Sequence, residues 1–168
     1  MTRHASSLMP PWGSWSPVDR ATLVFILRDD ELLLIRKLRG LGAGKINGPG
    51  GRLEPGETAV ACAKREVEEE LHVTPLNLTE AGELRFQFVD GHSIHGFVFV
   101  ANAFIGEPQA TDEAIPIWTK RAAIPYQEMW ADDVLWLPHL LAGRHFRGRF
   151  VFDGDVMLEH EVIVASDE

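Results

Sequence analysis

Apolar runs of strand length open the interpretable part of the chain. ATLVFIL (residues 21–27) and ELLLIRK (residues 31–37) are separated by the polar stretch RDD, and this pattern predicts a β-hairpin. A glycine-rich loop follows at residues 38–57. A loop of that length inside a compact domain is more often functional than accidental, so we expect it to carry part of a site.

A helical repeat follows the loop. Val60, Ala63, Val67 and Leu71 recur three or four positions apart, and Thr58 stands where a helix N-cap is expected. The spacing therefore predicts a helix over residues 58–71.

The remaining chain returns to strand patterns, with one further helix. Strands are predicted at 82–89, 94–105 and 115–120, a second helix at 132–143, and a closing hairpin at 149–164 around Asp153 and Gly154. Strands on both sides of a helix, with another helix near the end, indicate an α/β protein, an α/β/α sandwich on a mixed β-sheet.

Composition limits the kind of partner. The chain has 168 residues, 45% of them apolar, which suits one domain with a proper core. Its net charge of −9 argues against a nucleic-acid polymer as partner. A small phosphorylated ligand remains compatible, because a bound divalent cation can supply positive charge.

The first segment and the single cysteine bear on location. Residues 1–18 are rich in Ser, Pro and Gly, lack the apolar core of a signal peptide, and are expected to form a flexible leader whose Trp12 and Trp15 can dock onto the domain. Cys62 is the only cysteine of the chain, which excludes an intramolecular disulfide, and we interpret it as a residue that packs the helix. We expect a cytoplasmic monomer with no membrane span and a single domain at residues 19–168.

Three glutamates share one face of the first predicted helix. Glu66, Glu69 and Glu70 stand at i, i+3 and i+4, whereas Glu68 points elsewhere as a solvated charge. Converging carboxylates beside a glycine-rich loop suit Mg²⁺, which takes oxygen ligands and bridges them to phosphates. The plain alternative is a solvated acidic helix face.

The loop favours the metal reading. Five basic residues fall within seventeen positions of this acidic chain: Arg36, Lys37, Arg39, Lys45 and Arg52. Backbone N–H groups of a glycine-rich turn can line an anion site. A cationic loop leading into a carboxylate-bearing helix is what a metal-dependent attack on a pyrophosphate link requires.

GRLEPGETAVACAKREVEEELHV, from Gly51 to Val73, resembles the signature of the Nudix hydrolases. Eight positions match at the fixed spacing: Gly51, Glu57, Arg65, Glu66, Val67, Glu69, Glu70 and Val73. His72 stands where the family usually has glycine at the helix C-terminus. Because histidine tolerates the left-handed conformation better than most residues, we expect a small cost in stability and intact chemistry.

The resemblance implies a set of roles at this end of the site. Glu66, Glu69 and Glu70 would be catalytic and would bind Mg²⁺, with Mn²⁺ as a substitute, together with the carbonyl of Gly50 and a later glutamate, Glu113. One of the glutamates would help to activate water, without the sequence saying which. Arg65 and Glu57 would be the structural pair that orients the loop against the helix.

Base recognition has to come from outside the signature. In MWADDVLW, the adjacent Asp132 and Asp133 beside Trp130 could be an ordinary acidic helix N-terminus. The chain, however, resembles from about Thr22 onward the branch of the family that hydrolyses oxidised purine nucleoside triphosphates. That resemblance makes Asn47, Asp132 and Asp133 the groups that read the base and Trp130 its stacking platform.

The remaining substrate-binding residues follow from the same resemblance: Thr22, Lys37, Pro49, Gly50, Gly51, Arg52, Phe86, Phe88 and Ala131. Two neighbouring carboxyl groups in an apolar pocket can share one proton, so we expect tolerance of both oxidised guanine and oxidised adenine. Leu41 and Pro49 stand where that branch has phenylalanines, which bears on the fit of the base.

Other functions remain in competition at this point. The same chemistry could act on methylated purine triphosphates, ordinary deoxynucleoside triphosphates or nucleoside diphosphate derivatives. A non-catalytic nucleotide-binding module would be expected to have lost some of the glutamates, which are all present. The histidines His92, His95, His139, His145 and His160 have no ligand spacing and read as surface or structural residues.

Overall fold

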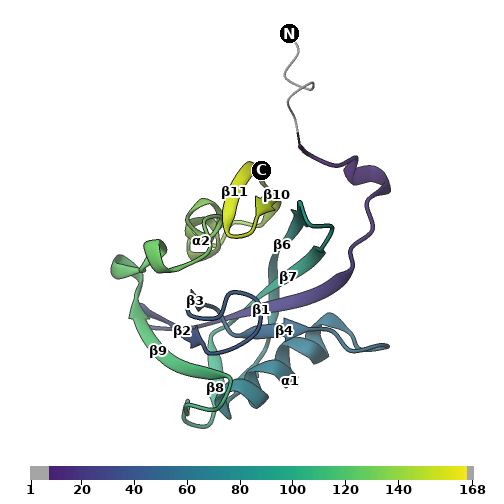
Figure 1. Ribbon diagram of the computed structural model, residues 1–168. Coiled ribbons are helices and arrows are strands. Elements are labelled where there is room, and N and C mark those ends of the chain that lie inside the picture. Colours follow the sequence, from purple (N-terminus) through teal and green to yellow (C-terminus); the bar gives the residue numbers. More distant parts are fainter. Residues whose placement is uncertain (1–7, 166–168) are drawn as a thin grey trace.

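Strands make up most of the regular secondary structure in the computed structural model, which describes residues 8–165 (Figure 1). The predictions for residues 1–7 of the leader and residues 166–168 of the domain lie outside the described part of the chain. In chain order the strands are β1 (Asp19–Arg28), β2 (Glu31–Lys37), β3 (Ile46–Asn47), β4 (Gly50–Arg52), β5 (Thr74–Leu76), β6 (Thr79–Phe88), β7 (Ser93–Ala101), β8 (Ala103–Ile105), β9 (Ala114–Lys120), β10 (Phe146–Asp153) and β11 (Val156–Val164).

Nine of the strands within residues 8–165 form one mixed sheet. Its main path runs β11-β10-β6-β7-β1-β2-β3, while β4 pairs with β1 and β9 pairs with β2. The β1–β7 and β6–β10 pairs are parallel, and the other pairs are antiparallel. Strands β5 and β8 form a separate two-stranded sheet.

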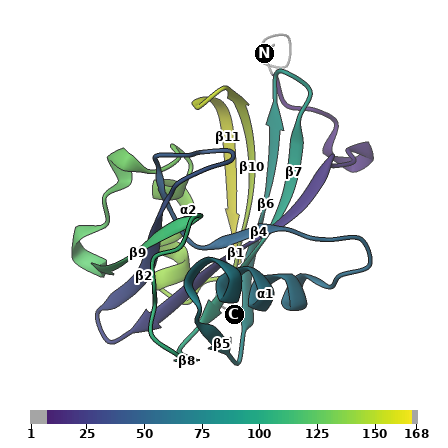
Figure 2. The same ribbon diagram turned by 60° about the horizontal axis from the view of Figure 1, so that its bottom comes forward.

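Helices cover the two faces of the sheet, as Figures 1 and 2 show. Helix α1 (Ala59–Leu71) buries Ala63, Val67 and Leu71 against inward residues of β1 and β2. Helix α2 (Asp133–Leu141) buries Trp136 and Leu137 in a second cluster on the other face. The predicted α/β/α sandwich on a mixed sheet is confirmed.

The limits of α1 follow from local chemistry. The hydroxyl of Thr58 accepts a 3.1 Å hydrogen bond from the N–H of Ala61, which caps the first turn. At the other end His72 adopts the left-handed conformation with φ 60°. The substitution of the signature's glycine by histidine is thus accommodated without a change in the helix end.

Three segments differ from the pattern-based expectations. The loop at 38–57 contains the two short strands β3 and β4, and the run predicted as one strand at 94–105 divides into β7 and β8. Strand β5 was not predicted. These short strands are fixed by pairing with distant strands, which local periodicity does not report.

Residues 8–18, expected to belong to a flexible leader, contact the sheet along β6 and β7. A 3-10 helix, η2 (Trp12–Ser14), precedes Trp15, whose indole N–H donates a 2.8 Å hydrogen bond to Oε1 of Gln87. The backbone N–H of Val18 donates to Oγ of Ser93 at 2.9 Å. The described part of the leader therefore has specific partners on the sheet, while the domain boundary at residue 19 stays a prediction.

Candidate functional site

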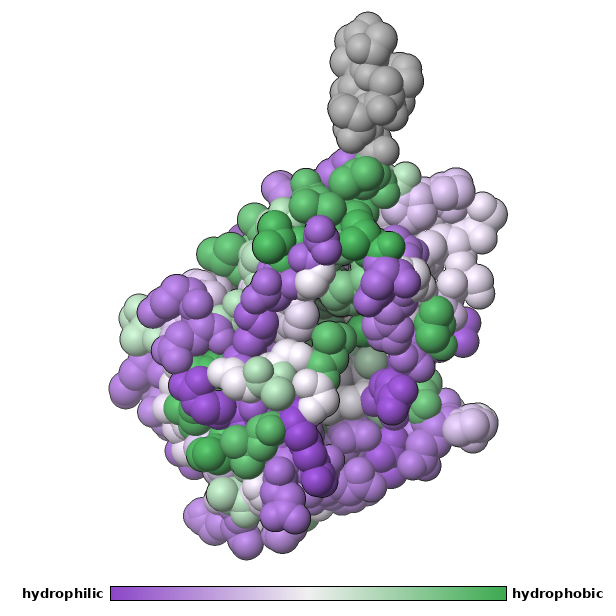
Figure 3. Space-filling model, viewed as in Figure 1, coloured by the Kyte–Doolittle hydropathy of each residue, from purple (hydrophilic) through white to green (hydrophobic). Residues whose placement is uncertain are grey.

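A cavity of about 570 Å³ lies between α1, the sheet and the segment leading into α2. Figure 3 shows a hollow in this face of the molecule, with pale and green residues inside it and purple residues around it. Its walls include most of the predicted site residues: Thr22, Lys37, Asn47, Gly50, Gly51, Arg52, Glu66, Glu70, Phe86, Phe88, Glu113, Trp130, Asp132 and Asp133. Separate stretches of sequence are thus brought to one cavity.

Three predicted residues do not line this cavity. Glu69 lines a smaller hollow beside it, which it shares with Glu66 and Arg65. Pro49 is buried, and its carbonyl accepts a 2.8 Å hydrogen bond from the N–H of Val24. Ala131 is exposed to solvent. Their roles in binding stay predictions, and the geometry gives Pro49 a place in the strand pairing beneath the site.

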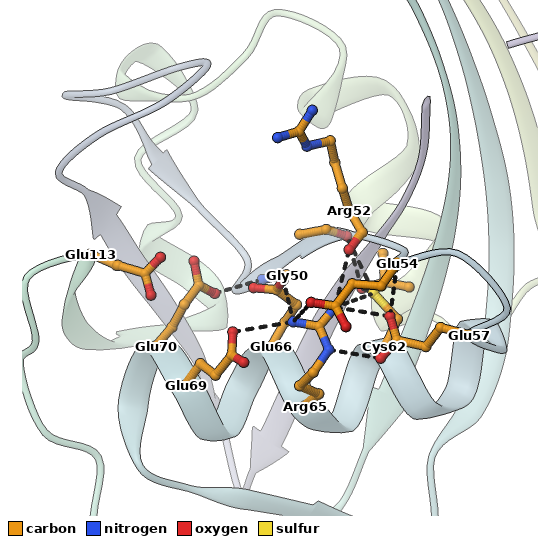
Figure 4. Close-up of polar contacts among 12 residues, drawn as sticks. Gly50, Arg52, Glu54, Glu57, Cys62, Arg65, Glu66, Glu69, Glu70 and Glu113 are labelled. Carbon is orange, nitrogen blue, oxygen red and sulfur yellow. Dashed lines mark hydrogen bonds and ion pairs between the residues drawn. The ribbon is translucent and has the colours of Figure 1, made fainter. Parts of the chain in front are cut away.

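Glu70 and Gly50 meet at the acidic end of the cavity (Figure 4). The backbone N–H of Gly50 donates a 2.9 Å hydrogen bond to Oε1 of Glu70, whose residue is only 4% exposed. Burial, together with the nearby charges of Glu66 and Glu113, raises the pKa of Glu70 to about 8. A nearby cation would stabilise the ionised form of this carboxyl group.

Glu113 reaches this end through the loop before β9. The hydroxyl of Thr111 donates to the carbonyl of Glu70 at 2.8 Å, and the N–H of Glu113 donates to that hydroxyl at 3.2 Å. The carbonyl of Glu113 also accepts from the N–H of Leu38 at 3.0 Å. These bonds tie the loop to both the helix and the glycine-rich segment, so the late glutamate is held beside Glu70.

Arg65 occupies the centre of the acidic face of α1. Its guanidinium donates to both carboxylate oxygens of Glu57, at 2.7 Å and 2.9 Å, in a bidentate pair. The same guanidinium donates to Glu66 at 2.9 Å and to Glu69 at 3.1 Å. Glu68 lies off this face and accepts from the hydroxyl of Thr74 at 2.8 Å. The arginine therefore offsets the repulsion within the acidic run.

The pKa values of the acids around Arg65 depend on its charge and on burial. Arg65 and the N–H of Glu54 lower the pKa of Glu57 to about 2. Burial raises the pKa of Glu66, although the guanidinium opposes that effect. The acids of this end of the site thus differ: Glu57, in the loop before α1, is a firm anion, whereas Glu66 and Glu70 on α1 bear unfavourable charge that a cation would stabilise.

The acidic end of the cavity offers oxygen donors to a divalent metal. Within residues 8–165 no three His, Cys, Asp or Glu side chains are already gathered closely enough to hold an ion, and Glu66 and Glu69 both accept hydrogen bonds from Arg65. The available donors are nevertheless oxygens, which hard cations prefer. Glu70, buried and crowded by like charge, provides the reason for a cation to bind here, so the residues fit one.

Glycines allow the loop to approach the helix. A Cβ atom at Gly51 would lie 2.3 Å from Cδ of Glu66, and one at Gly50 would lie 1.9 Å from the carbonyl oxygen of Thr22. No side chain can occupy either position without displacing its neighbour. The close approach of β4 to α1 therefore depends on Gly51, and its close approach to β1 depends on Gly50.

The opposite end of the cavity is aromatic and carries two buried acids. The ring of Trp130 makes edge contacts with Phe88 and Phe152, with centroids 6.3 Å and 5.5 Å apart. Asp132 is 1% exposed and Asp133 is 6% exposed. Both side chains are in an apolar setting where an unpaired charge is costly.

Asp132 is held by the helix that it precedes. Its Oδ2 accepts a 2.7 Å hydrogen bond from the indole N–H of Trp136, whereas Oδ1 has no partner within the described residues. Asp132 occupies the N-cap position of α2 and makes no side-chain capping bond. The alternative of an ordinary acidic helix start therefore does not account for its side chain.

Burial raises the pKa of both aspartates. For Asp133 the pKa lies well above the ordinary value, because burial is reinforced by the charge of the neighbouring Asp132. For Asp132 burial raises the pKa to about 6, and the hydrogen bond from Trp136 opposes the rise. Burial and mutual repulsion therefore favour the protonated form in this pair, most strongly at Asp133.

Several lining residues were not identified from the sequence. They are Asp19, Ala21, Leu23, Phe25, Ile35, Gly40, Gly48, Leu84, His92, Ile94 and Gly96. Leu84 could have been found, because it alternates with Phe86 and Phe88 along β6 and so faces the same side. Asp19 and His92 belong to no motif. Asp19 is the first residue of the predicted domain, and His92 is predicted to be a surface or structural residue. Only the strand register places them at the cavity.

Comparisons with known proteins show which family this chain is similar to. The NUDIX domain family matches residues 17–140. An oxidized purine nucleoside triphosphate hydrolase from Danio rerio is 40% identical over 148 residues, covering 87% of this chain and 95% of that protein. The protein of the same name from Mus musculus is 37% identical, covering 84% and 92% of the two chains.

A solved structure agrees with the fold. The crystal structure of a MutT protein from Bacillus halodurans superimposes with a TM-score of 0.77 at 28% identity, covering 86% of this chain and 97% of that one. No helix in the described part of the chain is long and apolar enough to cross a membrane.

Proposed function

Because the chain belongs to the Nudix hydrolase family, we propose that it converts oxidised purine nucleoside triphosphates to the monophosphate and pyrophosphate. The proposed substrates are 8-oxo-dGTP and 2-oxo-dATP, and the proposed role is cleaning of the nucleotide pool. The names of the relatives from Danio rerio and Mus musculus support this substrate class. The unpaired, buried Oδ1 of Asp132 is the observation in this chain that carries it.

The base end suits a purine with altered donors and acceptors. Oδ1 of Asp132 has no hydrogen-bond partner within the described residues, and the raised pKa of the neighbouring Asp133 favours its protonated form, which can donate to a base. Asn47, whose amide donates to the carbonyl of Lys45 at 3.3 Å, adds a third polar group to the wall. We expect a purine edge to satisfy these groups while Trp130 covers the ring.

Nudix hydrolases generally use a divalent metal, and we propose Mg²⁺ for this chain, with Mn²⁺ as a substitute. Glu66, Glu69, Glu70, Glu113 and the carbonyl of Gly50 would hold it. When bound, such an ion neutralises phosphate charge and lowers the pKa of a water molecule. Those residues come from one helix face, one strand and one tethered loop.

The protein's own groups then have distinct tasks. Arg65 keeps Glu66 and Glu69 oriented through two hydrogen bonds and fixes the loop through Glu57. A glutamate at the acidic end takes the proton of the attacking water as the bond between two phosphates breaks, and pyrophosphate leaves. Lys37 and Arg52, both on the cavity wall, bind phosphate oxygens.

The direct test measures pyrophosphate release with Mg²⁺ from 8-oxo-dGTP, 2-oxo-dATP and dGTP at micromolar concentrations. We expect the oxidised purines to be hydrolysed at least about tenfold more efficiently than dGTP. Asp132→Asn and Asp133→Asn should each alter the preference between the two oxidised bases. An unchanged preference in both variants would remove the base-reading role.

The catalytic roles are tested separately from base recognition. Glu70→Gln and Glu69→Gln should lower kcat by roughly a hundredfold or more while nucleotide binding is retained. Glu68→Gln on the same helix is the matched control and should keep wild-type turnover, because Glu68 lies off the acidic face. Equal trace activity in wild type and both variants would favour a non-catalytic binding module.

Another nucleotide is a second candidate substrate, because Leu41 lines the cavity at a position where the branch of oxidised purine hydrolases has phenylalanine. The same assay with a methylated purine triphosphate, the ordinary dNTPs and a nucleoside diphosphate derivative would reveal it. The monomeric state and the cytoplasmic location stay proposals, to be tested by sedimentation and by imaging of the tagged protein.

A further inference from the structure

A continuous line of contacts joins the aromatic end of the cavity to its basic edge. The ring of Phe88 lies between Trp130, at 6.3 Å, and the imidazole of His92, at 5.8 Å between centroids. Nε2 of His92 is 3.5 Å from Oδ2 of Asp19, and Nη1 of Arg52 is 3.7 Å from the same oxygen. All five residues line the cavity.

The basic edge adjoins the acidic helix. Arg52 follows Gly51, whose backbone packs against the carboxylate of Glu66. Asp19 and Arg52 also line the smaller hollow that holds Glu66 and Glu69. The Asp19–His92 pair therefore stands between the platform proposed for the base and the end proposed for the phosphates.

A nucleotide has the same order of parts, with its sugar between base and phosphates. We propose that Asp19 and His92 form a sugar subsite, in which the carboxylate accepts a hydrogen bond from a sugar hydroxyl and the imidazole contacts the same edge. This inference rests on the proposed function in taking a nucleotide as the ligand. It assigns a role to two residues outside the signature and outside the aspartate pair.

The chemistry of the pair favours a hydroxyl over a phosphate. A carboxylate repels a phosphate, whereas carboxylates commonly accept hydrogen bonds from ribose hydroxyls. Asp19 lies at the start of β1, and its side chain is 22% exposed, so it is open to a ligand without being fully solvated. The ion pairs with Arg52 and His92 both use Oδ2, so Oδ1 can accept a hydrogen bond from a ligand.

The pair is held in place from the backbone. The N–H of His92 donates to Oδ1 of Asp90 at 2.9 Å, and its carbonyl accepts from the N–H of Phe88 at 2.9 Å. The parallel pairing of β1 and β7 sets Asp19 opposite Ile94, two residues after His92. A site fixed in this way can discriminate between ligands that differ by one hydroxyl.

The test is a sugar series on one base. Ribo, 2′-deoxy and 2′,3′-dideoxy forms of the fastest purine triphosphate are compared by kcat/KM. We expect the wild-type enzyme to use the dideoxy form at least about tenfold less efficiently than the best of the other two. In Asp19→Asn the kcat/KM values for the three sugars should lie within about twofold of one another. The change should come from KM, with kcat changed less than about twofold.

A second variant guards against a folding defect. His92→Phe retains a ring against Phe88 and removes both ring nitrogens, so it should reduce the discrimination in the same direction. Asp30→Asn is the matched control, since Asp30 is an exposed residue that pairs with Lys120 at 3.2 Å on the surface. It should leave the sugar series unchanged.

The outcomes separate this inference from the proposed function. A flat sugar series in wild type, or a wild-type spread in both Asp19→Asn and His92→Phe, overturns the sugar subsite. A steep sugar series with no preference for oxidised bases keeps the subsite and rejects the proposed base preference. Failure to hydrolyse or bind any nucleotide overturns both.

Discussion

The indole N–H of Trp136 donates a 2.7 Å hydrogen bond to Oδ2 of Asp132, and both side chains are buried. Trp136→Phe removes the donor and leaves that oxygen without a partner. We expect the free energy of unfolding to fall by about 1–3 kcal/mol. KM for the oxidised purine should rise roughly tenfold, because Asp132 loses its orientation, while kcat changes little. Steady-state kinetics and urea unfolding check both.

Leu140→Ala separates recognition from stability. Leu140 is a buried residue of the same helix, and it makes its contacts in the core rather than with Asp132. Its truncation should cost about 2–5 kcal/mol of unfolding free energy without a matching rise in KM. If both variants raise KM equally, the Trp136 hydrogen bond has no special part in base recognition.

The buried acid pair predicts a pH dependence of stability. Burial raises the pKa of Asp133 well above that of an exposed aspartate. Its proton is held more firmly in the folded state, so this group stabilises the fold fully below about pH 4, its unfolded pKa. That contribution is lost as the pH rises through the pKa of Asp133 in the folded protein. The neighbouring Asp132 follows the same rule, and its pKa in the folded protein is about 6.

Asp133→Asn cannot lose this proton. Between about pH 4 and pH 8 its free energy of unfolding should therefore fall less steeply than that of the wild type. Urea unfolding at several pH values gives both curves, and the exposed Asp30→Asn serves as control. Parallel curves for wild type and Asp133→Asn would contradict the raised pKa.

The Arg65–Glu57 pair predicts an effect on turnover. Glu57→Gln replaces a bidentate carboxylate, with contacts of 2.7 Å and 2.9 Å, by a neutral amide that has one acceptor oxygen. The guanidinium should then move toward Glu66 and Glu69 and displace them. We expect kcat to fall roughly tenfold to a hundredfold, with a smaller change in KM.

Glu54→Gln is the matched comparison. Its carboxylate is 66% exposed in the side chain and lies 4.0 Å from Arg65, at the limit of an ion pair. Such exposed pairs contribute little, so kcat should stay within about twofold of the wild type. A similar fall of kcat in both variants would show that the loop, and not the bidentate pair, sets the orientation.

Local patterns were sufficient for the helix that carries the acids. The periodicity around Val67 and the cap at Thr58 predicted α1 to within one residue, and helical spacing put Glu66, Glu69 and Glu70 on one face. The engagement of Glu66 and Glu69 by Arg65 was not foreseen, because a guanidinium chooses among several acids only in three dimensions. Their expected convergence on a metal stays a prediction.

Long-range pairing accounts for most of what the sequence did not provide. Strand β3 pairs with β2, and β4 pairs with β1, so their short runs are stabilised by neighbours and not by their own pattern. His92 carries no motif, and it reaches the cavity because the β6–β7 hairpin and the β1–β7 register bring it to Asp19. Periodicity contains no information on such register.

Hydrogen bonds link Trp15 of the N-terminal leader to the cavity wall through Gln87. Trp15 donates to Oε1 of Gln87 at 2.8 Å, and the amide of Gln87 donates to the carbonyls of Phe88 and His92 at 3.0 Å and 3.2 Å. This relay fixes the β6–β7 turn from the side opposite the cavity. Trp15→Phe keeps the aromatic ring and removes the donor.

We expect Trp15→Phe to raise KM about twofold to fivefold without lowering kcat, because Phe88 and His92 lose part of their support. Trp12→Phe is the matched control: Trp12 packs on Trp15 with centroids 5.0 Å apart and is the other tryptophan of the described leader. It should leave KM at the wild-type value. Hydrogen exchange should show faster exchange at residues 88–92 in Trp15→Phe alone. Equal exchange in wild type and both variants would mean that the leader does not support the cavity wall.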